Sequence, residues 1–141
     1  MTESLIKIDY VDNVASLVLN RPEKRNALTR DLLRELSQAL SDLGGEKRVR
    51  AIILSGDGPS FCAGMDLKEM AETAKLPDSQ AMWDSDARIY LEVIEKILRL
   101  PKPVIAAVDG AAVAGGGGIV LACDLVVAST GAKFGFPEPR R

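Results

Sequence analysis

The sequence contains no histidine among its 141 residues. Ser–His and Cys–His nucleophilic pairs are therefore excluded within these residues, and so are most zinc sites, because each needs an imidazole. Cysteine is scarce as well: Cys62 and Cys123 lie far apart in the sequence and form no CxxC pair. We interpret both as small buried fillers with free thiols, which is typical of a reducing compartment. We expect a cytoplasmic protein, or one from an organelle matrix, and no metal site.

Basic tracts and long apolar runs are also lacking. The net charge is −2, and no basic tract is longer than a pair such as Lys47-Arg48, so the sequence carries no electrostatic footprint for a nucleic acid. The weakly polar stretch 104–123 is interrupted by Asp109 and by glycines, and charged residues interrupt the first ten positions. We therefore expect no nucleic-acid partner, no membrane span and no signal peptide.

The remaining composition is that of an ordinary globular domain, with 47% apolar and 27% charged residues. Short apolar runs alternate with helical patterns, which predicts an α/β fold with βαβ crossovers and parallel strand pairing. The clearest helix begins after Thr29, a suitable N-cap residue, and stops at Gly44-Gly45. The predicted strands cover residues 5–10, 14–19, 50–55, 104–108 and 125–128; further helices cover residues 67–74, about 79–100 and the segment that follows the glycine run.

Four consecutive glycines open the last of these helices, in AGGGGIVLACD at residues 114–124. A P-loop is excluded because Ile119 follows the last glycine, and the dinucleotide pattern G-x-G-x-x-G/A fails because its last position falls on Val120 or Leu121. Two uses remain. The glycines allow close packing of helix on strand, or they leave backbone N–H groups free to bind an oxygen that gains negative charge.

A second segment, GDGPSFCAGMDL at residues 56–67, also leads from a predicted strand through glycines into a short helix. Two N–H donors that converge on one carbonyl oxygen are what an acyl enolate requires. The pair of segments therefore favours the second use of the glycine run.

Four ordered motifs carry a resemblance to a known family: NRPEKRNAL at 20–28, SFCAGMDLKEM at 60–70, the glycine segment that ends in ACDLVVAS, and FGFPE at 134–138. Together they resemble the enoyl-CoA hydratase/isomerase (crotonase) superfamily over residues 6–138. The resemblance implies a crotonase-like ββα spiral core. Residues 1–141 would then be the N-terminal portion of a single crotonase-like domain, truncated before its C-terminal helical region.

The resemblance also implies a function in acyl-CoA metabolism. The substrate would be an acyl-CoA thioester, with no separate cofactor because coenzyme A is part of the substrate. The full-length chain would form a homo-oligomer, a trimer or a dimer of trimers. The backbone N–H groups of Met65 and Gly115 would form an oxyanion hole, and Glu138 would be the acid/base. Substrate contacts are implied at Lys24, Arg25, Ala27, Ala63, Met65, Asp66, Leu67, Lys68, Gly115 and Gly118.

Simpler interpretations stay open for some of these residues. Lys24 and Arg25 are equally consistent with a solvated charged turn, and Asp66 is expected to be a helix N-cap in either case. A further group lies in the helical stretch that often lines the acyl pocket of such proteins, although core packing is the favoured interpretation: Met82, Trp83 and Tyr90.

One departure from the family pattern bears on the chemistry. Hydratases of this family use two glutamates, and the first of them falls here on Gly118, which has no side chain. One carboxylate is enough to move a proton between two carbons, so Glu138 favours a Δ3-Δ2 enoyl-CoA isomerase. The alternatives are a hydratase that uses a substitute second carboxylate, and a non-catalytic acyl-CoA-binding or scaffold protein. The candidate substitutes are Asp84, Asp86 and Glu92.

Overall fold

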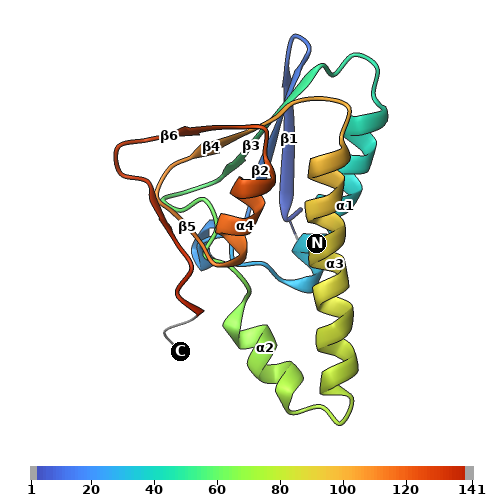
Figure 1. Cartoon of the computed structure of the whole chain (residues 1–141), viewed down its shortest axis with the longest axis vertical. Helices are drawn as coiled ribbons and strands as arrows, with labels where there is room; N and C mark the ends of the chain where they lie inside the picture. The colour runs from blue at the N-terminus through green and yellow to red at the C-terminus, as the bar shows by residue number, and fades with distance from the viewer. Residues whose placement is uncertain (1–2, 139–141) are drawn as a thin grey trace.

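The computed structural model describes residues 3–138, which form a five-stranded sheet with helices packed on one face (Figure 1). The strand order is β1-β2-β3-β4-β6. β1 (Ile6–Val11) and β2 (Val14–Leu19) form the antiparallel hairpin, and β3 (Ala51–Gly56), β4 (Val104–Val108) and β6 (Leu125–Ala128) follow by parallel pairing. The predicted α/β class and the predicted parallel pairing are both confirmed.

In the described part of the chain, four helices connect these strands: α1 (Arg30–Gly45), α2 (Leu67–Ala74), α3 (Ser79–Arg99) and α4 (Gly115–Ala122). As predicted, Thr29 is the N-cap of α1, and its hydroxyl accepts a hydrogen bond from the amide of Leu32 at 3.1 Å. Gly44 and Gly45 form the last turn of α1 instead of lying beyond it. The predicted bounds of the strands agree with the observed ones to within one residue.

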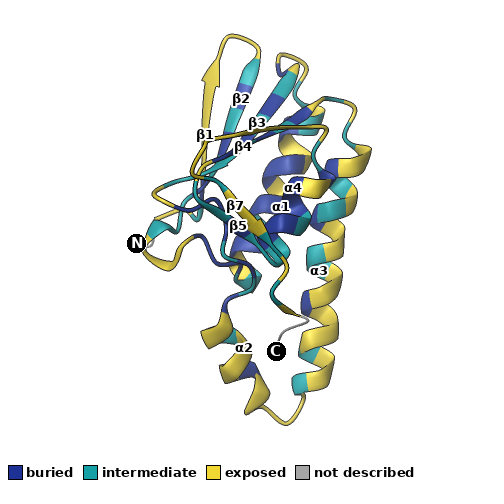
Figure 2. Ribbon diagram, turned by 60° about the vertical axis from the view of Figure 1, so that its left-hand side comes forward, coloured by how far each residue is buried: buried dark blue, intermediate teal, exposed yellow. Residues whose placement is uncertain are grey.

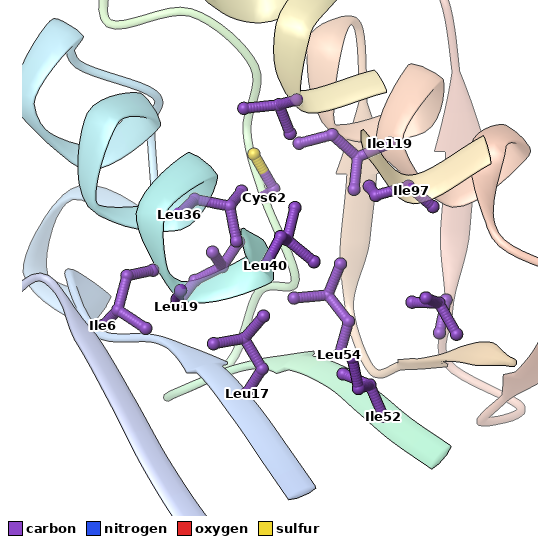
Figure 3. Close-up of a cluster of buried hydrophobic side chains, with 14 of the residues drawn as sticks. Ile6, Leu17, Leu19, Leu36, Leu40, Ile52, Leu54, Cys62, Ile97 and Ile119 are labelled. Atoms are coloured by element: carbon purple, nitrogen blue, oxygen red, sulfur yellow. The ribbon is translucent and has the colours of Figure 1, made fainter. Parts of the chain in front are cut away.

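The hydrophobic core lies between α1 and the sheet. Leu36 and Leu40 of α1 point toward Leu17 and Leu54 of the central strands (Figure 3), and all four side chains are fully buried. Full burial of one such side chain stabilises a fold by about 1.5–3 kcal/mol. Figure 2 shows this burial concentrated on α1 and the central strands, while α2 and the adjacent end of α3 are largely exposed. The core therefore fixes the sheet and α1 firmly, and α2 projects from it.

The structure also contains short elements that the sequence did not predict. β5 (Ala111–Val113) and β7 (Lys133–Gly135) pair in parallel as a small second sheet, and a 3-10 turn, η1, covers Pro22–Lys24. Three residues are too few to produce a recognisable hydrophobic period. The pairing of β5 with β7 nevertheless decides where the end of the described chain lies.

Candidate active site

The loops that follow β3 and β4 lie side by side. Because the two strands are parallel neighbours, their carboxyl ends meet at the same edge of the sheet, where α/β proteins commonly bind ligands. Beyond the strands, the amide of Cys62 donates to the carbonyl of Ala111 at 3.0 Å, and the amide of Val113 donates to the carbonyl of Cys62 at 3.1 Å. The two glycine-containing segments are thus hydrogen-bonded to each other.

Glycines allow this close approach. Gly64 has a φ of +92°, and a Cβ atom built on it would lie 2.8 Å from the Cβ of Ala114. A Cβ on Gly116 would lie only 2.4 Å from the carbonyl oxygen of Cys62. Side chains at either position would push the segments apart. Close packing, the first of the two uses considered for the glycine run, therefore applies to Gly116.

Met65 and Gly115 both line the hollow between these segments. Within residues 3–138, neither the amide of Met65 nor that of Gly115 donates to a protein acceptor. Gly115 is the first residue of α4, so its N–H lies at the positive end of the helix dipole. Such donors can stabilise an oxygen that gains negative charge. The hollow has a volume of about 260 Å³ and is lined by Ala63, Met65, Leu67, Met70, Val113, Ala114, Gly115, Pro137 and Glu138.

The small second sheet brings Glu138 to this hollow. β7 pairs with β5 so that Val113 lies opposite Gly135, and the amide of Ala114 donates to the carbonyl of Gly135 at 2.9 Å. The chain then reaches Glu138, an exposed residue that lines the hollow together with Met65 and Gly115. The structure therefore brings together the three residues predicted to be catalytic.

The NRPEKRNAL motif lies along one side of the same loop. The amide of Ala63 donates to the carbonyl of Arg25 at 3.0 Å, and the amide of Leu28 donates to the carbonyl of Gly64 at 2.7 Å. Lys24 and Arg25 are exposed, so the solvated-turn interpretation fits their surroundings, whereas Ala27 is buried. Apart from Gly115 and Gly118, the predicted substrate contacts thus lie in two adjacent segments, 24–27 and 63–68. Ala27 has almost no accessible side chain.

Asp66 is the N-cap of α2, as predicted. One carboxylate oxygen accepts from the amide of Glu69 at 2.8 Å, and the other accepts from Nη1 of Arg21 at 2.7 Å. Burial opposes ionisation of Asp66, but these hydrogen bonds and the charge of Arg21 outweigh it, so the pKa of Asp66 is lowered. The carboxylate is already fully engaged. Leu67 and Lys68, in the first turn of α2, are exposed.

Asn26 is an organising residue that the sequence did not single out. Its Oδ1 accepts from the amide of Arg21 at 2.8 Å, and its Nδ2 donates to the carbonyls of Asp57 and Ser60, each at 2.9 Å. The side chain is fully buried. Asn26 therefore ties the NRPEKRNAL turn to the loop after β3. Its place inside that motif was the only signal available.

Tyr90, on α3, lies over Gly118. A Cβ on Gly118 would lie 2.2 Å from the Tyr90 hydroxyl oxygen, and that hydroxyl donates to the carbonyl of Gly115 at 2.8 Å. Tyr90 also packs against the core, as the sequence interpretation held. Burial raises the pKa of Tyr90, and the anionic forms of Cys62 and Glu138 add to the rise. The adjoining hollow of about 310 Å³ is lined by Met65, Tyr90, Ala114, Gly115, Gly118, Phe136 and Glu138.

Of the three candidate substitute carboxylates, only Asp86 borders a hollow that shares residues with the site. It borders a hollow of about 230 Å³ together with Met65, Met70, Trp83, Ala87 and Tyr90. Both its carboxylate oxygens accept from the guanidinium of Arg30, one of them from Nη2 at 2.6 Å, which raises the pKa of Arg30. Asp84 accepts instead from Gln80 on the surface, and Glu92 pairs with Lys96 at 3.1 Å.

Other predicted features can be placed as well. Cys62 is fully buried and Cys123 is partly buried, and both thiols are free. In the described part of the chain, no three His, Cys, Asp or Glu side chains gather to hold a metal ion. None of the described helices is long and apolar enough to cross a membrane.

The comparison with known protein families identifies one family that the chain matches. Residues 9–141 match the family model described as enoyl-CoA hydratase/isomerase. The chain belongs to this family. Its members cover varied chemistry: the chain is 43% identical to an enoyl-CoA isomerase/hydratase of Mycosarcoma maydis over 89% of its own length and 47% of that protein. It is 40% identical to a 4-chlorobenzoyl coenzyme A dehalogenase of an Arthrobacter species, over 92% of its own length and 46% of that protein.

Solved structures of the enoyl-CoA hydratase/isomerase family support the same fold. An enoyl-CoA hydratase/isomerase from Xanthobacter autotrophicus Py2 superimposes with a TM-score of 0.89 at 36% identity, over 99% of this chain and 51% of that one. The chain thus spans about half the length of the relatives that it matches. A crotonase-like fold is confirmed, for the part of the family domain that this chain covers.

Proposed function

We propose that the whole protein acts on acyl-CoA thioesters and moves a carbon–carbon double bond by a one-base mechanism. The observation that supports this most directly is the composition of one hollow, which is lined by Met65, Gly115 and Glu138, the first two with amides that donate to no acceptor among the described residues. The family's other glutamate position matches Gly118. The thioester oxygen would accept from the two amides. One such donor is worth about 2.7–4 kcal/mol of transition-state stabilisation.

In the proposed reaction, the carboxylate of Glu138 removes a proton from the α carbon of a 3-enoyl-CoA. The electron pair moves onto the thioester oxygen, and the oxyanion hole stabilises the resulting dienolate. Glu138, now protonated, returns the proton to the γ carbon, and the double bond moves to the 2 position. No water and no redox cofactor take part, because atoms and electrons balance within the substrate and Glu138.

The two exposed segments beside the hollow are the proposed coenzyme A contacts. Lys24 and Arg25 are exposed cations next to the loop of residues 63–68, which suits the phosphates of coenzyme A. Asp66 shapes this loop as an N-cap and does not need a free carboxylate. We also propose a cytoplasmic location, consistent with two free thiols, and a trimer or a dimer of trimers for the whole protein.

A second candidate is water addition with Asp86 as the substitute carboxylate, because Asp86 lines the hollow that also contacts Met65 and Tyr90. Its two oxygens are already occupied by Arg30. This arrangement favours a structural role for Asp86 over acid–base catalysis, so double-bond migration remains the preferred proposal.

The decisive experiment offers 2-enoyl-CoA and 3-enoyl-CoA separately to the full-length protein and follows water addition and double-bond migration. Glu138→Gln should lower the rate of migration by about 10²–10⁴-fold, the usual contribution of a general acid–base group, while calorimetry should still detect acyl-CoA binding. Glu72→Gln, on the exposed surface of α2, is the matched control. Binding without any turnover by the unaltered protein would instead favour the scaffold alternative.

A further inference from the structure

Each glycine of the four-residue run has a different neighbour where its side chain would be. A Cβ on Gly116 would meet the backbone of Cys62 at 2.4 Å, and one on Gly117 would meet the ring of Phe136 at 3.1 Å. At Gly118 the obstacle is a single atom, the Tyr90 hydroxyl oxygen at 2.2 Å. The next nearest atom there is Cζ of the same ring at 3.5 Å, an ordinary van der Waals distance. Removal of one oxygen would therefore make room for a Cβ atom.

We propose that Tyr90 is a positioning and specificity-determining residue: its hydroxyl fills the space where the side chain of a second acid–base carboxylate would begin and holds the carbonyl of Gly115, the residue whose N–H is the proposed donor, which favours double-bond migration over water addition. This inference rests on the proposed function above. It assigns to Tyr90 a role through Gly115 and through the exclusion of a side chain at position 118, not through contact with the reacting atoms.

Tyr90 is held firmly enough for such a role. One turn before it on α3, Asp86 is bound by Arg30 at the start of α1, and one turn after it Val93 is fully buried in the core. The hydroxyl itself is fixed by its 2.8 Å hydrogen bond to the carbonyl of Gly115. A side chain at position 118 would have to push the hydroxyl away and break its hydrogen bond to Gly115, so the conflict between the two positions is a steric one.

The acid–base groups that line the hollow decide which reaction is favoured. To add water, an enzyme must let the water oxygen bond to the β carbon, accept one proton from that water and deliver one proton to the α carbon, which suits two acid–base groups. The Tyr90 hydroxyl already donates to Gly115, and its raised pKa keeps it a neutral phenol. Among the described residues, Glu138 is the only carboxylate that lines this hollow. One group is sufficient for proton transfer between two carbons.

The steric part is tested by thermal unfolding of four full-length proteins: the unaltered protein, Tyr90→Phe, Gly118→Ala and the double variant. Gly→Ala within a helix normally stabilises, so we expect Gly118→Ala to lower Tm when Tyr90 is present and to raise Tm in the Tyr90→Phe background. Gly45→Ala, where nothing lies within 4 Å, and Tyr10→Phe, on the exposed face of β1, are the matched controls. Additive effects of the two substitutions would overturn the proposal.

The chemical part is tested with Tyr90→Phe and with Tyr90→Phe/Gly118→Glu. Loss of the hydrogen bond to Gly115 should lower kcat for migration by about three- to tenfold, the usual value of one neutral hydrogen bond, with KM nearly unchanged because the oxyanion donor acts mainly in the transition state. The double variant should gain water addition to 2-enoyl-CoA, and Gly118→Glu alone should not.

The two proposals fail in different ways. The role of Tyr90 would be overturned if Gly118→Glu and the double variant added water to 2-enoyl-CoA at the same rate. It would also be overturned if Tyr90→Phe left kcat for migration unchanged. Either result would count even if migration itself is observed. Failure of the unaltered protein to bind any CoA thioester would overturn the proposed function. The thermal-unfolding cycle would still decide whether Tyr90 excludes a side chain at position 118, because it requires no substrate.

Discussion

Gly64 and Ala114 are in direct contact across the two loops of the site, so closely that a Cβ on Gly64 would lie 2.8 Å from that of Ala114. Each is followed in the chain by one of the two residues proposed to supply the oxyanion donors, Met65 and Gly115, and both of these line the hollow. The contact therefore limits how far apart the two proposed oxyanion donors can lie. Both residues also have a positive φ, +92° for Gly64 and 52° for Ala114.

Gly64→Ala should disrupt this contact and lower both stability and activity. The added methyl group meets Ala114 in a backbone region that disfavours side chains, where strain costs about 1–3 kcal/mol. We expect a loss of that size in the free energy of unfolding, measured by denaturant titration, together with a larger relative fall in kcat than in substrate binding. Gly45→Ala, with open space around it, is the control and should be neutral or stabilising. Equal stability of the two variants would refute the contact's importance.

Ala114→Gly should have the opposite effect on stability. Ala114 has φ 52° and ψ −124°, a conformation that glycine adopts without strain. Relief of about 1–3 kcal/mol of strain exceeds the roughly 0.4–1 kcal/mol lost through greater freedom of the unfolded chain. We expect a net gain of about 1 kcal/mol in the free energy of unfolding. Ala71→Gly on the exposed face of α2 should instead lose about 1 kcal/mol, so two substitutions of the same kind should differ in sign.

Asp66→Asn should make stability less dependent on acid pH. Asparagine retains an N-cap oxygen but loses the charged pair with Arg21, so we expect a loss of about 1.5–3 kcal/mol near neutral pH. The pKa of Asp66 is lowered in the folded protein, so its stabilisation is complete above the unfolded value of 3.8 and is lost as pH falls through the folded pKa. The two proteins should converge in that acid range. Asp31→Asn, in an exposed pair with Arg34, should change stability much less.

Cys62 should resist alkylation in the folded protein. Burial raises the pKa of Cys62 to about 12, and burial and Asp124 raise that of Cys123 to about 12. Because the thiolate is the reactive form, both cysteines should react slowly with iodoacetamide near pH 8 and rapidly after unfolding in guanidinium chloride. Mass spectrometry after proteolysis distinguishes the two sites. Fast native labelling of Cys62 would mean that the two loops separate often, because the backbone of Cys62 in one loop is hydrogen-bonded to Ala111 and Val113 in the other.

The main sheet and its helices could be predicted from local pattern alone. The buried residues of α1 recur at helical spacing, and its N-cap Thr29 is visible in the sequence. β5 and β7 could not be predicted, because Ala111–Val113 and Lys133–Gly135 become strands only through pairing with each other. Their pairing is a tertiary contact, and no local sequence pattern indicates it.

In the candidate site too, some features could be predicted from the sequence and others could not. The family resemblance predicted Met65, Gly115 and Glu138, and the structure places all three around one hollow. The resemblance could not predict that Tyr90 lies over Gly118, because that contact depends on the rotation of α3 against α4. Nor could the resemblance predict the ion pair between Arg30 and Asp86, which joins α1 to α3. Long-range packing decides these relationships, and the residues involved have no distinctive spacing.

The crowding of Gly118 by one phenolic oxygen also bears on how this site can change by mutation. A Cβ atom at position 118 is obstructed while Tyr90 is present, yet it has ordinary clearance after Tyr90→Phe. We therefore expect the two substitutions to show sign epistasis, so that an evolutionary path toward a side chain at position 118 is open in one order and closed in the other. Loss of the hydroxyl must come first.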